Sequence, residues 1–315
     1  MIPLAVRLDH YLEIRRGLGF DLSTAARVLR RFVEFAAAEG MSHITTALFL
    51  RWREGFGSAD NNTWSARLGM VRGFAAWLQG MDVRTEVPPS GLVSGKPRRA
   101  RPYIYSCAET SALVGEAARL PSAWGLRGWT YATFFGLITA TGLRIHEAIM
   151  LDDADVDTGA AVLLIKRGKN GRTRLVPVTA CTAARLDAYR NERDRILGPT
   201  PGPFFLQESG LRPTDCAARY TFSQICQNIG LRARPGFHRH GRGPRIHDLR
   251  HTFAVRAILN WYHRGLDPDR EMFHLSTYLG HTKPEHTYWY IEAVPELLQL
   301  ACQRAERSLT GKGAL

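Results

Sequence analysis

The sequence is poor in the residues that build disulfides, metal clusters and membrane helices. Its 315 residues include five cysteines, and none of them shows a Cys-x-x-Cys or Cys/His spacing. No apolar run approaches the roughly 18 residues of a membrane span, and no basic segment followed by an apolar one opens the chain. A Walker-type glycine loop is also missing. These absences favour a soluble, cytoplasmic protein without disulfides, signal peptide or nucleotide cofactor.

Acidic residues are scarce relative to arginine. The 29 Asp and Glu stand against 42 Lys and Arg, which gives a net charge of +13 and a pI of about 10.0. Only five of the basic residues are lysines. A basic excess favours a polyanionic partner, because basic side chains release counterions from phosphates. An arginine-rich proteome is the alternative explanation, so the charge by itself leaves both open.

Residues 1–88 have the apolar periodicity of four helices. Apolar side chains recur every three or four positions, and glycines follow the ends of these segments. We therefore predict a helical N-terminal domain whose aromatic residues form its core. Its surface arginines, including Arg67 and Arg72, are candidates for DNA contact.

Residues 89–105 are rich in proline, glycine and positive charge. Proline blocks helix formation and biases the preceding residue to extended geometry. We predict a basic linker that lies along the phosphate backbone, the alternative being a solvated hinge. The candidate DNA-binding residues of this linker are Arg98, Arg99 and Arg101.

Residues 106–315 are mainly helical, with one β exception. Two β-rich runs, 161–165 and 173–177, flank an Asn-Gly turn, which predicts a hairpin. The expected fold class is mainly α with a small β-hairpin or sheet in the catalytic domain (α+β). A C-terminal helix with an apolar stripe packs either on a partner protomer or on its own domain. Further DNA-binding candidates in this domain are Arg172, Arg239 and Arg242.

Five short motifs in this second domain carry the residue types that phosphodiester transesterification requires. Their six candidate catalytic residues are Arg144, Lys169, His247, Arg250, His281 and Tyr290. Guanidinium groups suit the transition state, because they stay charged and bind phosphate oxygens in bidentate fashion. A lysine on a hairpin turn suits general acid catalysis at the departing 5′ oxygen, with Lys166 as the alternative to Lys169.

Spacing indicates how some of these residues meet. His247 and Arg250 are three apart and share a helix face. A Thr-x-x-Glu capping box with proline, residues 282–285, starts a new helix, on which Tyr288 and Tyr290 point roughly 200° apart. Only one of the two tyrosines therefore enters the site.

Each candidate has a structural alternative. For Arg144, the alternative to a catalytic role is an intrahelical ion pair with Glu147. For Arg250, it is a salt bridge on the surface. His247 and His251 are four apart, as in zinc helices, but aspartate replaces the glutamate of that motif and no third ligand is evident. No metal is therefore expected.

The order and spacing of the motifs resemble those of the tyrosine recombinase (phage integrase) family over most of the chain. In that family the nucleophile follows the last histidine by nine residues, which selects Tyr290. The resemblance implies a metal-independent, site-specific recombinase that works through a 3′-phosphotyrosine and a free 5′ hydroxyl. Arg144 and Arg250 then stabilise the phosphorane and Lys169 is the general acid. His247 and His281 orient the phosphate and assist proton transfer.

The resemblance also implies partners. These are double-stranded DNA and further protomers, two at each site and four at synapsis, with a sister recombinase as an option. Residues 287–295 look like those of integrases carried by bacterial mobile elements, which places the protein at the bacterial nucleoid. Two alternatives remain: a type IB topoisomerase, which relaxes supercoils as a monomer, and a DNA-binding regulator that has lost catalysis.

Overall fold

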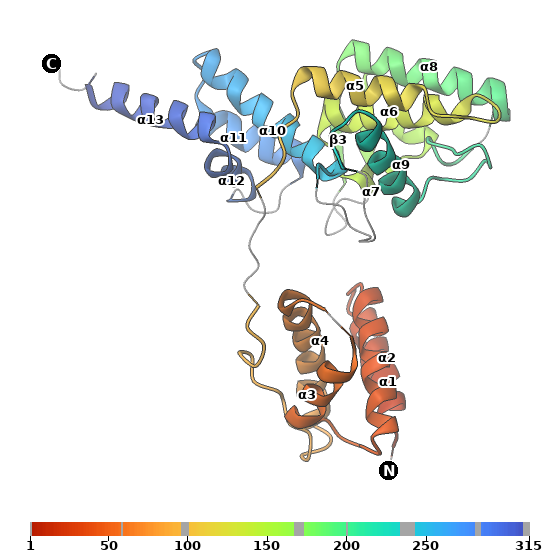
Figure 1. Ribbon diagram of the computed structural model, residues 1–315, viewed down its shortest axis with the longest axis vertical. Coiled ribbons are helices and arrows are strands. Elements are labelled where there is room, and N and C mark those ends of the chain that lie inside the picture. Colours follow the sequence, from red (N-terminus) through yellow and green to blue (C-terminus); the bar gives the residue numbers. More distant parts are fainter. Residues whose placement is uncertain are drawn as a thin grey trace. The chain divides into compact units, whose positions relative to one another are not determined.

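The chain folds into two compact units, Met1–Ala100 and Arg101–Leu315 (Figure 1). The structure is a computed structural model that describes residues 2–57, 59–95, 101–166, 173–199, 201–233, 243–280 and 285–310. The described elements are mostly helices, with one small sheet in the second unit. The predicted fold class, mainly α with a small sheet, is confirmed.

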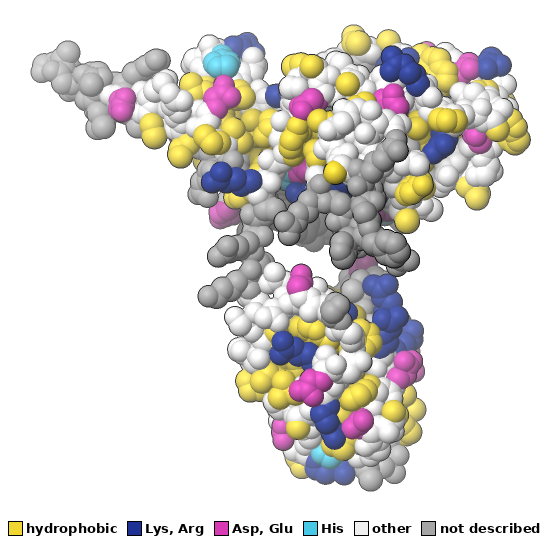
Figure 2. Space-filling model, in the orientation of Figure 1, with side chains coloured by type: hydrophobic (Ala, Val, Ile, Leu, Met, Phe, Trp, Pro, Cys, Tyr) yellow, Lys and Arg dark blue, Asp and Glu magenta, His cyan; other side chains and the backbone are white. Residues whose placement is uncertain are grey.

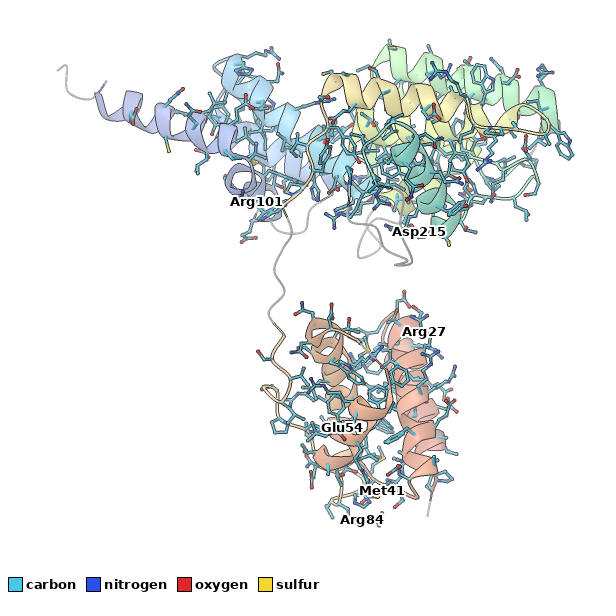
Figure 3. All side chains as sticks on the ribbon, viewed as in Figure 1. Arg27, Met41, Glu54, Arg84, Arg101 and Asp215 are labelled. Carbon is cyan, nitrogen blue, oxygen red and sulfur yellow. The ribbon has the colours of Figure 1, made fainter. Side chains whose placement is uncertain are left out.

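The first unit is a helical bundle. Its helices are α1 (Leu4–Gly17), α2 (Ser23–Ala38), α3 (Thr46–Gly55) and α4 (Asn61–Gln79). Side-chain caps start two of them, since Thr45 Oγ1 accepts from the Leu48 amide at 3.1 Å and Asp60 Oδ1 from the Thr63 amide at 2.7 Å. Figure 3 shows Arg27 at one end of this bundle and Met41 and Arg84 at the other.

Aromatic rings fill the interior of this bundle. Trp52 is 1% exposed, and its ring centroid lies 5.1 Å from those of both Phe32 and Trp64 in edge-to-face arrangements. Such pairs add to the free energy gained by burying apolar area. The prediction that these aromatic residues form the core is confirmed.

The second unit carries the remaining elements. In chain order they are α5 (Cys107–Ala118), α6 (Leu126–Thr141), α7 (Ile145–Ile149), η1 (Asp153–Asp155), β1 (Val156–Asp157), β2 (Val162–Ile165), β3 (Arg174–Pro177), α8 (Ala180–Leu197), α9 (Asp215–Asn228), α10 (Ile246–His263), α11 (Pro268–Leu279), α12 (Glu285–Ala293) and α13 (Pro295–Thr310). Helix α6 is apolar on nearly every side and lies within the largest core cluster.

The small sheet contains the predicted hairpin. Strands β2 and β3 pair antiparallel, with Leu163 opposite Val176 and Ile165 opposite Arg174. The two-residue strand β1 adds on the other side of β2 and was not anticipated, because two residues carry no alternation. The turn with Lys169 lies outside the described residues.

The segment that enters the second unit is fastened to α10. The Tyr105 amide donates to Thr252 Oγ1 at 3.0 Å, and Arg256 Nη2 donates to the Tyr105 carbonyl at 2.8 Å. Tyr105 itself is 1% exposed. Because α10 also carries His247 and Arg250, the start of the unit is bonded directly to the helix that supplies two candidate catalytic residues.

Helix α13 packs on its own unit through part of its surface. Leu297 is fully buried in the cluster around α10 and α12, whereas Leu298 is half exposed. Arg304 Nη2 donates to Asp267 Oδ1 at 2.8 Å. Figure 1 shows the helix running outward from the rest of the unit. Packing within the unit therefore accounts for one end of the predicted apolar stripe.

No helix in the described part of the chain is long and apolar enough to cross a membrane. In the face drawn in Figure 2, the described Lys and Arg side chains occur on both units, interspersed with acidic and apolar ones. The positive charge that the structure describes on this face is therefore not gathered in one continuous patch.

Candidate active site

Arg250 is a buried cation held by main-chain carbonyls. It lies on α10 and is 1% exposed, and its Nη1 donates to the Gly142 carbonyl at 2.7 Å and its Nη2 to the Leu279 carbonyl at 2.8 Å. Burial and the nearby Arg144 cation lower the pKa of Arg250 to about 10, while Tyr290 opposes this. The guanidinium therefore stays charged near neutral pH. The surface salt bridge considered for this residue is not what holds it.

Gly142 makes this arrangement sterically feasible. It ends α6 with a φ of 64°, the left-handed region that favours glycine. A Cβ at this position would lie 2.6 Å from Phe253 Cδ1 and 3.0 Å from Leu279 Cδ2. The glycine of the Thr-Gly-Leu-Arg motif thus lets α6 stop against α10 and α11 while its carbonyl receives Arg250.

Arg144 follows immediately and reaches the same segment. It is the N-cap residue of α7, and its Nη2 donates to the Gly280 carbonyl at 3.2 Å. Its Nη1 donates to Glu147 Oε1 at 2.8 Å, so the predicted intrahelical pair exists. Arg144 and Arg250 both bond the C-terminal carbonyls of α11, the end of a helix that attracts cations. Arg144 therefore pairs with Glu147 and also shares a carbonyl acceptor, that of Leu279, with Arg250.

Glu147 neutralises a second arginine, Arg174. The carboxylate is buried and receives Arg174 Nη1 at 3.0 Å and Nη2 at 2.9 Å. Burial acts to raise the pKa of Glu147, but the hydrogen bonds and charges of Arg174 and Arg144 outweigh it and lower the pKa to about 2. Arg174 Nε also donates to the Tyr278 carbonyl at 2.9 Å. Sequence reasoning missed this role of Arg174; the only available signal was its place in the β3 run.

His247 lies on α10 one turn before His251. Their rings meet edge to face, with centroids 4.6 Å apart. His247 is exposed, although the ring of His251 lies against its own. This partial withdrawal from water, together with the Arg250 cation, lowers the pKa of His247 below its usual range. The histidine is therefore mainly neutral at pH 7.

Tyr290 enters the site and Tyr288 does not. Tyr290 is 1% exposed on α12, whereas Tyr288 is 41% exposed, as expected for two residues about 200° apart on a helix. The Tyr290 hydroxyl lies 3.2 Å from His251 Nδ1. His251 is buried, and sequence reasoning considered it only as a metal ligand. Its position four residues after His247, on the same helix face, was the available signal.

Two predicted catalytic residues, Lys169 and His281, lie outside the described residues. The alternative lysine, Lys166, is described, and its Nζ lies 2.5 Å from Asp155 Oδ1. The hydrogen bond that Lys166 donates to Asp155 raises the pKa of Lys166, so its proton is held more tightly than that of a free lysine. This pairing makes Lys166 the less suitable general acid of the two.

The predicted DNA-binding arginines are only partly described. Arg67 is half-buried, with its guanidinium carbon 4.6 Å from the ring centroid of Trp64, and Arg72 donates to the Pro88 carbonyl. Arg101 is exposed where the chain enters the second unit (Figure 3). The others lie outside the described residues: Arg98, Arg99, Arg172, Arg239 and Arg242. Among the described residues, no group of three or more His, Cys, Asp or Glu is placed to hold a metal ion.

Comparisons of the sequence find the same class of protein. A model of the phage integrase family matches residues 116–296. A putative integrase/recombinase of Sinorhizobium fredii, y4rB, is 41% identical over 305 residues, which cover 95% of this chain and 96% of the relative. The tyrosine recombinase XerD of Caulobacter vibrioides is 28% identical over 294 residues, 91% of this chain and 85% of XerD.

Solved structures share the fold. The XerH site-specific recombinase bound to a palindromic difH substrate, a post-cleavage complex, aligns with a TM-score of 0.65 and 20% identity over 90% of this chain and 80% of XerH. A λ integrase dimer bound to a COC′ core site aligns with a TM-score of 0.59 and 15% identity over 92% and 77%. Fold, site and relatives together define a site-specific DNA recombinase of the tyrosine type. The chain belongs to the phage integrase family.

Proposed function

We propose that this recombinase cuts and rejoins double-stranded DNA through a covalent phosphotyrosine at Tyr290. The observation that carries the proposal is the place of Arg250 on α10. It shares the Leu279 carbonyl with Arg144 of α7, and the next residue, His251, contacts the hydroxyl of Tyr290 on α12. A phosphodiester is anionic, and attack on it adds charge to its equatorial oxygens. Two fixed guanidinium groups beside one phenol supply the stabilisation that this charge requires.

Each residue then has a defined role. The Tyr290 oxygen forms a bond to phosphorus, and the bond from phosphorus to the 5′ oxygen breaks. Lys169 gives the departing 5′ oxygen its proton, and Arg144 and Arg250 stabilise the phosphorane. His247 and His281 orient the phosphate and assist proton transfer. The 3′-phosphotyrosine link retains the bond energy, so a 5′ hydroxyl of another strand rejoins the DNA without a cofactor.

The burial of Tyr290 adds a condition to this reaction. Its side chain is 1% exposed, and a phosphodiester has to come within bonding distance of its hydroxyl. Binding of DNA must therefore shift α12 or the segments around it before cleavage. We expect the free protein to be a resting form and DNA to bring the nucleophile into reach.

We further propose an assembly of two protomers on each DNA site and four at synapsis. The likeness in fold to a λ integrase dimer on core-site DNA supports this arrangement. A sister recombinase in place of identical protomers is compatible with the same site. The resemblance of residues 287–295 to integrases of bacterial mobile elements supports a role in moving such an element within the bacterial nucleoid.

Covalent trapping tests the central claim. Wild-type protein, Tyr290→Phe and Tyr288→Phe would be incubated with nicked DNA from the flanks of the gene, in the presence of chelator, and run on a denaturing gel. We expect a protein–DNA adduct with wild type and with Tyr288→Phe, since Tyr288 lies on the other side of α12. Tyr290→Phe should form none.

Two other outcomes would point to the alternatives. An adduct that persists in Tyr290→Phe would place the nucleophile elsewhere. DNA that is shifted but never linked in any lane would favour the DNA-binding regulator. Relaxation of supercoiled plasmid without site preference would instead favour a topoisomerase.

A further inference from the structure

His251 contacts the hydroxyl of the proposed nucleophile. Its Nδ1 lies 3.2 Å from the Tyr290 hydroxyl, and His251 is 4% exposed while Tyr290 is 1% exposed. A phenol buried to this extent needs a hydrogen-bond partner, because an unpaired buried hydroxyl has lost its hydrogen bonds to water without replacement. The contact joins α10 to α12 at the reacting oxygen.

Ring contacts hold the imidazole in place. Its centroid lies 4.6 Å from that of His247, 5.5 Å from that of Trp289 and 5.4 Å from that of Tyr290. Rings on both sides restrict rotation of the His251 side chain. The orientation of the imidazole ring, and so the direction in which Nδ1 points, is thereby fixed relative to α10.

Charge disfavours a cationic imidazole at His251, and the direction of the hydrogen bond then depends on which neutral tautomer is present. The buried Arg250 cation precedes His251 on α10, and a positive charge on the imidazole beside it would be repelled. A neutral imidazole with an unprotonated Nδ1 accepts a hydrogen bond, and the Tyr290 hydroxyl donates it. The lone pairs of the Tyr290 oxygen are then turned away from His251, as attack on a phosphate requires.

We propose that His251 is a further catalytic residue, which accepts the Tyr290 hydrogen bond and so orients the nucleophilic oxygen. The inference rests on the proposed function, because it assigns His251 a role in the attack by Tyr290. It gives His251 a part distinct from those proposed for His247 and His281, which are to orient the phosphate.

Two nearly isosteric variants separate the hydrogen bond from packing. His251→Asn keeps an acceptor close to the place of Nδ1, and His251→Leu fills similar space without one. In single-turnover cleavage of nicked DNA, we expect His251→Leu to be slower than wild type by roughly 10²-fold, the scale for loss of one preorganised hydrogen-bonding group. His251→Asn should recover most of that rate. Thermal unfolding and DNA gel shifts of both variants check that folding and binding persist.

Equal losses in the two variants would overturn the proposal, because packing alone would then explain them. A His251→Leu variant that cleaves as fast as wild type would overturn it as well.

A second measurement does not depend on cleavage. Acetylation of tyrosines in the free protein, read by peptide mass spectrometry, should be slow at Tyr290 in wild type and His251→Asn and faster in His251→Leu. The exposed Tyr288 serves as the internal reference. If wild type forms no DNA adduct while this acetylation pattern holds, the proposed function fails and the hydrogen bond from Tyr290 to His251 stands. If His251→Leu leaves Tyr290 acetylation unchanged, the hydrogen bond does not hold the hydroxyl and the proposal fails.

Discussion

At the scale of single residues, the site depends on main-chain carbonyls as much as on side chains. The carbonyls of Gly142 and Leu279 each accept a hydrogen bond from Arg250, and both belong to helix ends. Carbonyls at a helix C-terminus have no partner within their own helix, so a guanidinium satisfies them without an acidic side chain. Arg250 can thus be buried with main-chain carbonyls among its hydrogen-bond partners.

Gly142 should tolerate no side chain. Gly142→Ala puts a Cβ 2.6 Å from Phe253 and forces a left-handed conformation on alanine. The conformation costs roughly 1–2 kcal/mol and the overpacking a further 1–3 kcal/mol. We expect a lower melting temperature in differential scanning calorimetry and a loss of cleavage, since the carbonyl that holds Arg250 moves.

Gly136→Ala is the matched control in the same helix. A Cβ there meets no atom within 4 Å, and alanine favours helix over glycine by roughly 0.5–1 kcal/mol. It should melt at or above the temperature of wild type and cleave normally. A Gly142→Ala protein with wild-type stability would show that the helix end yields easily.

Residue types, spacing and the family resemblance together predicted Arg144, His247, Arg250 and Tyr290 as one group. What they could not supply was the partners, because contacts such as Arg250 with Leu279 or His251 with Tyr290 join residues far apart in the sequence. The helical period also could not distinguish an arginine that projects into water from one that lies against an aromatic ring. Arg67 does the latter beside Trp64, and its role in DNA binding stays a prediction.

At the scale of elements, the ion pair of Glu147 and Arg174 joins α7, β3 and α11. Glu147 on α7 bonds Arg174 on β3, and Arg174 bonds the Tyr278 carbonyl of α11. Strand β3 leads back to the hairpin turn that carries Lys169 in the sequence. Glu147, which pairs with Arg144, therefore also holds the start of β3, the strand that follows the turn with the proposed general acid.

Glu147→Gln should change how stability depends on pH. The pKa of Glu147 is about 2 in the folded protein, against a usual 4.5, so the folded state favours the ionised form. Its contribution is complete above about pH 4.5 and is lost as the pH falls toward 2. At roughly 1.4 kcal/mol for each unit, the variant should lose on the order of 3 kcal/mol at pH 7 and show a flatter decline below pH 4.5. Urea unfolding at several pH values measures this.

Glu192→Gln provides the comparison. Glu192 also pairs with an arginine, Arg195, at 2.7 Å, but the arginine is largely exposed. Surface pairs typically contribute about 0–1 kcal/mol, so this variant should remain close to wild type at every pH. Parallel curves for Glu147→Gln and wild type would mean that the buried pair does not contribute through its charge.

Element positions followed from sequence where the pattern was long enough. The helical stripes of the first unit and the pairing of the two β-rich runs are confirmed. Strand β1 and the short η1 turn were missed, because two or three residues show no period. Three residues of the predicted capping box, 282–284, lie outside the described residues, and α12 begins at the last residue of the box, Glu285.

At the scale of the whole molecule, two separate cores and a divided charge suggest two DNA-binding bodies. One core cluster lies entirely within the first unit, and the others lie entirely within the second. Residues 1–100 carry 14 Lys and Arg against nine Asp and Glu, and residues 101–315 carry 28 against 20. Each unit therefore has a core to fold around and a positive excess to bring to phosphates.

The salt dependence of DNA binding should divide in the same way. The logarithm of the binding constant falls with the logarithm of salt in proportion to the phosphates neutralised, and 6–10 contacts lose roughly 10³–10⁵ in affinity between about 50 and 200 mM salt. We expect the full chain to show a steep slope on non-specific duplex, and a fragment of residues 101–315 a shallower one. Fluorescence anisotropy across a salt series measures both, with a thermal melt to establish that the fragment is folded. If the two slopes coincide, the first unit neutralises no phosphates, and its positive excess serves another purpose. A shallower slope and weaker binding for the fragment would instead show that the first unit contacts phosphates. Losing phosphate contacts lowers both the salt dependence and the affinity.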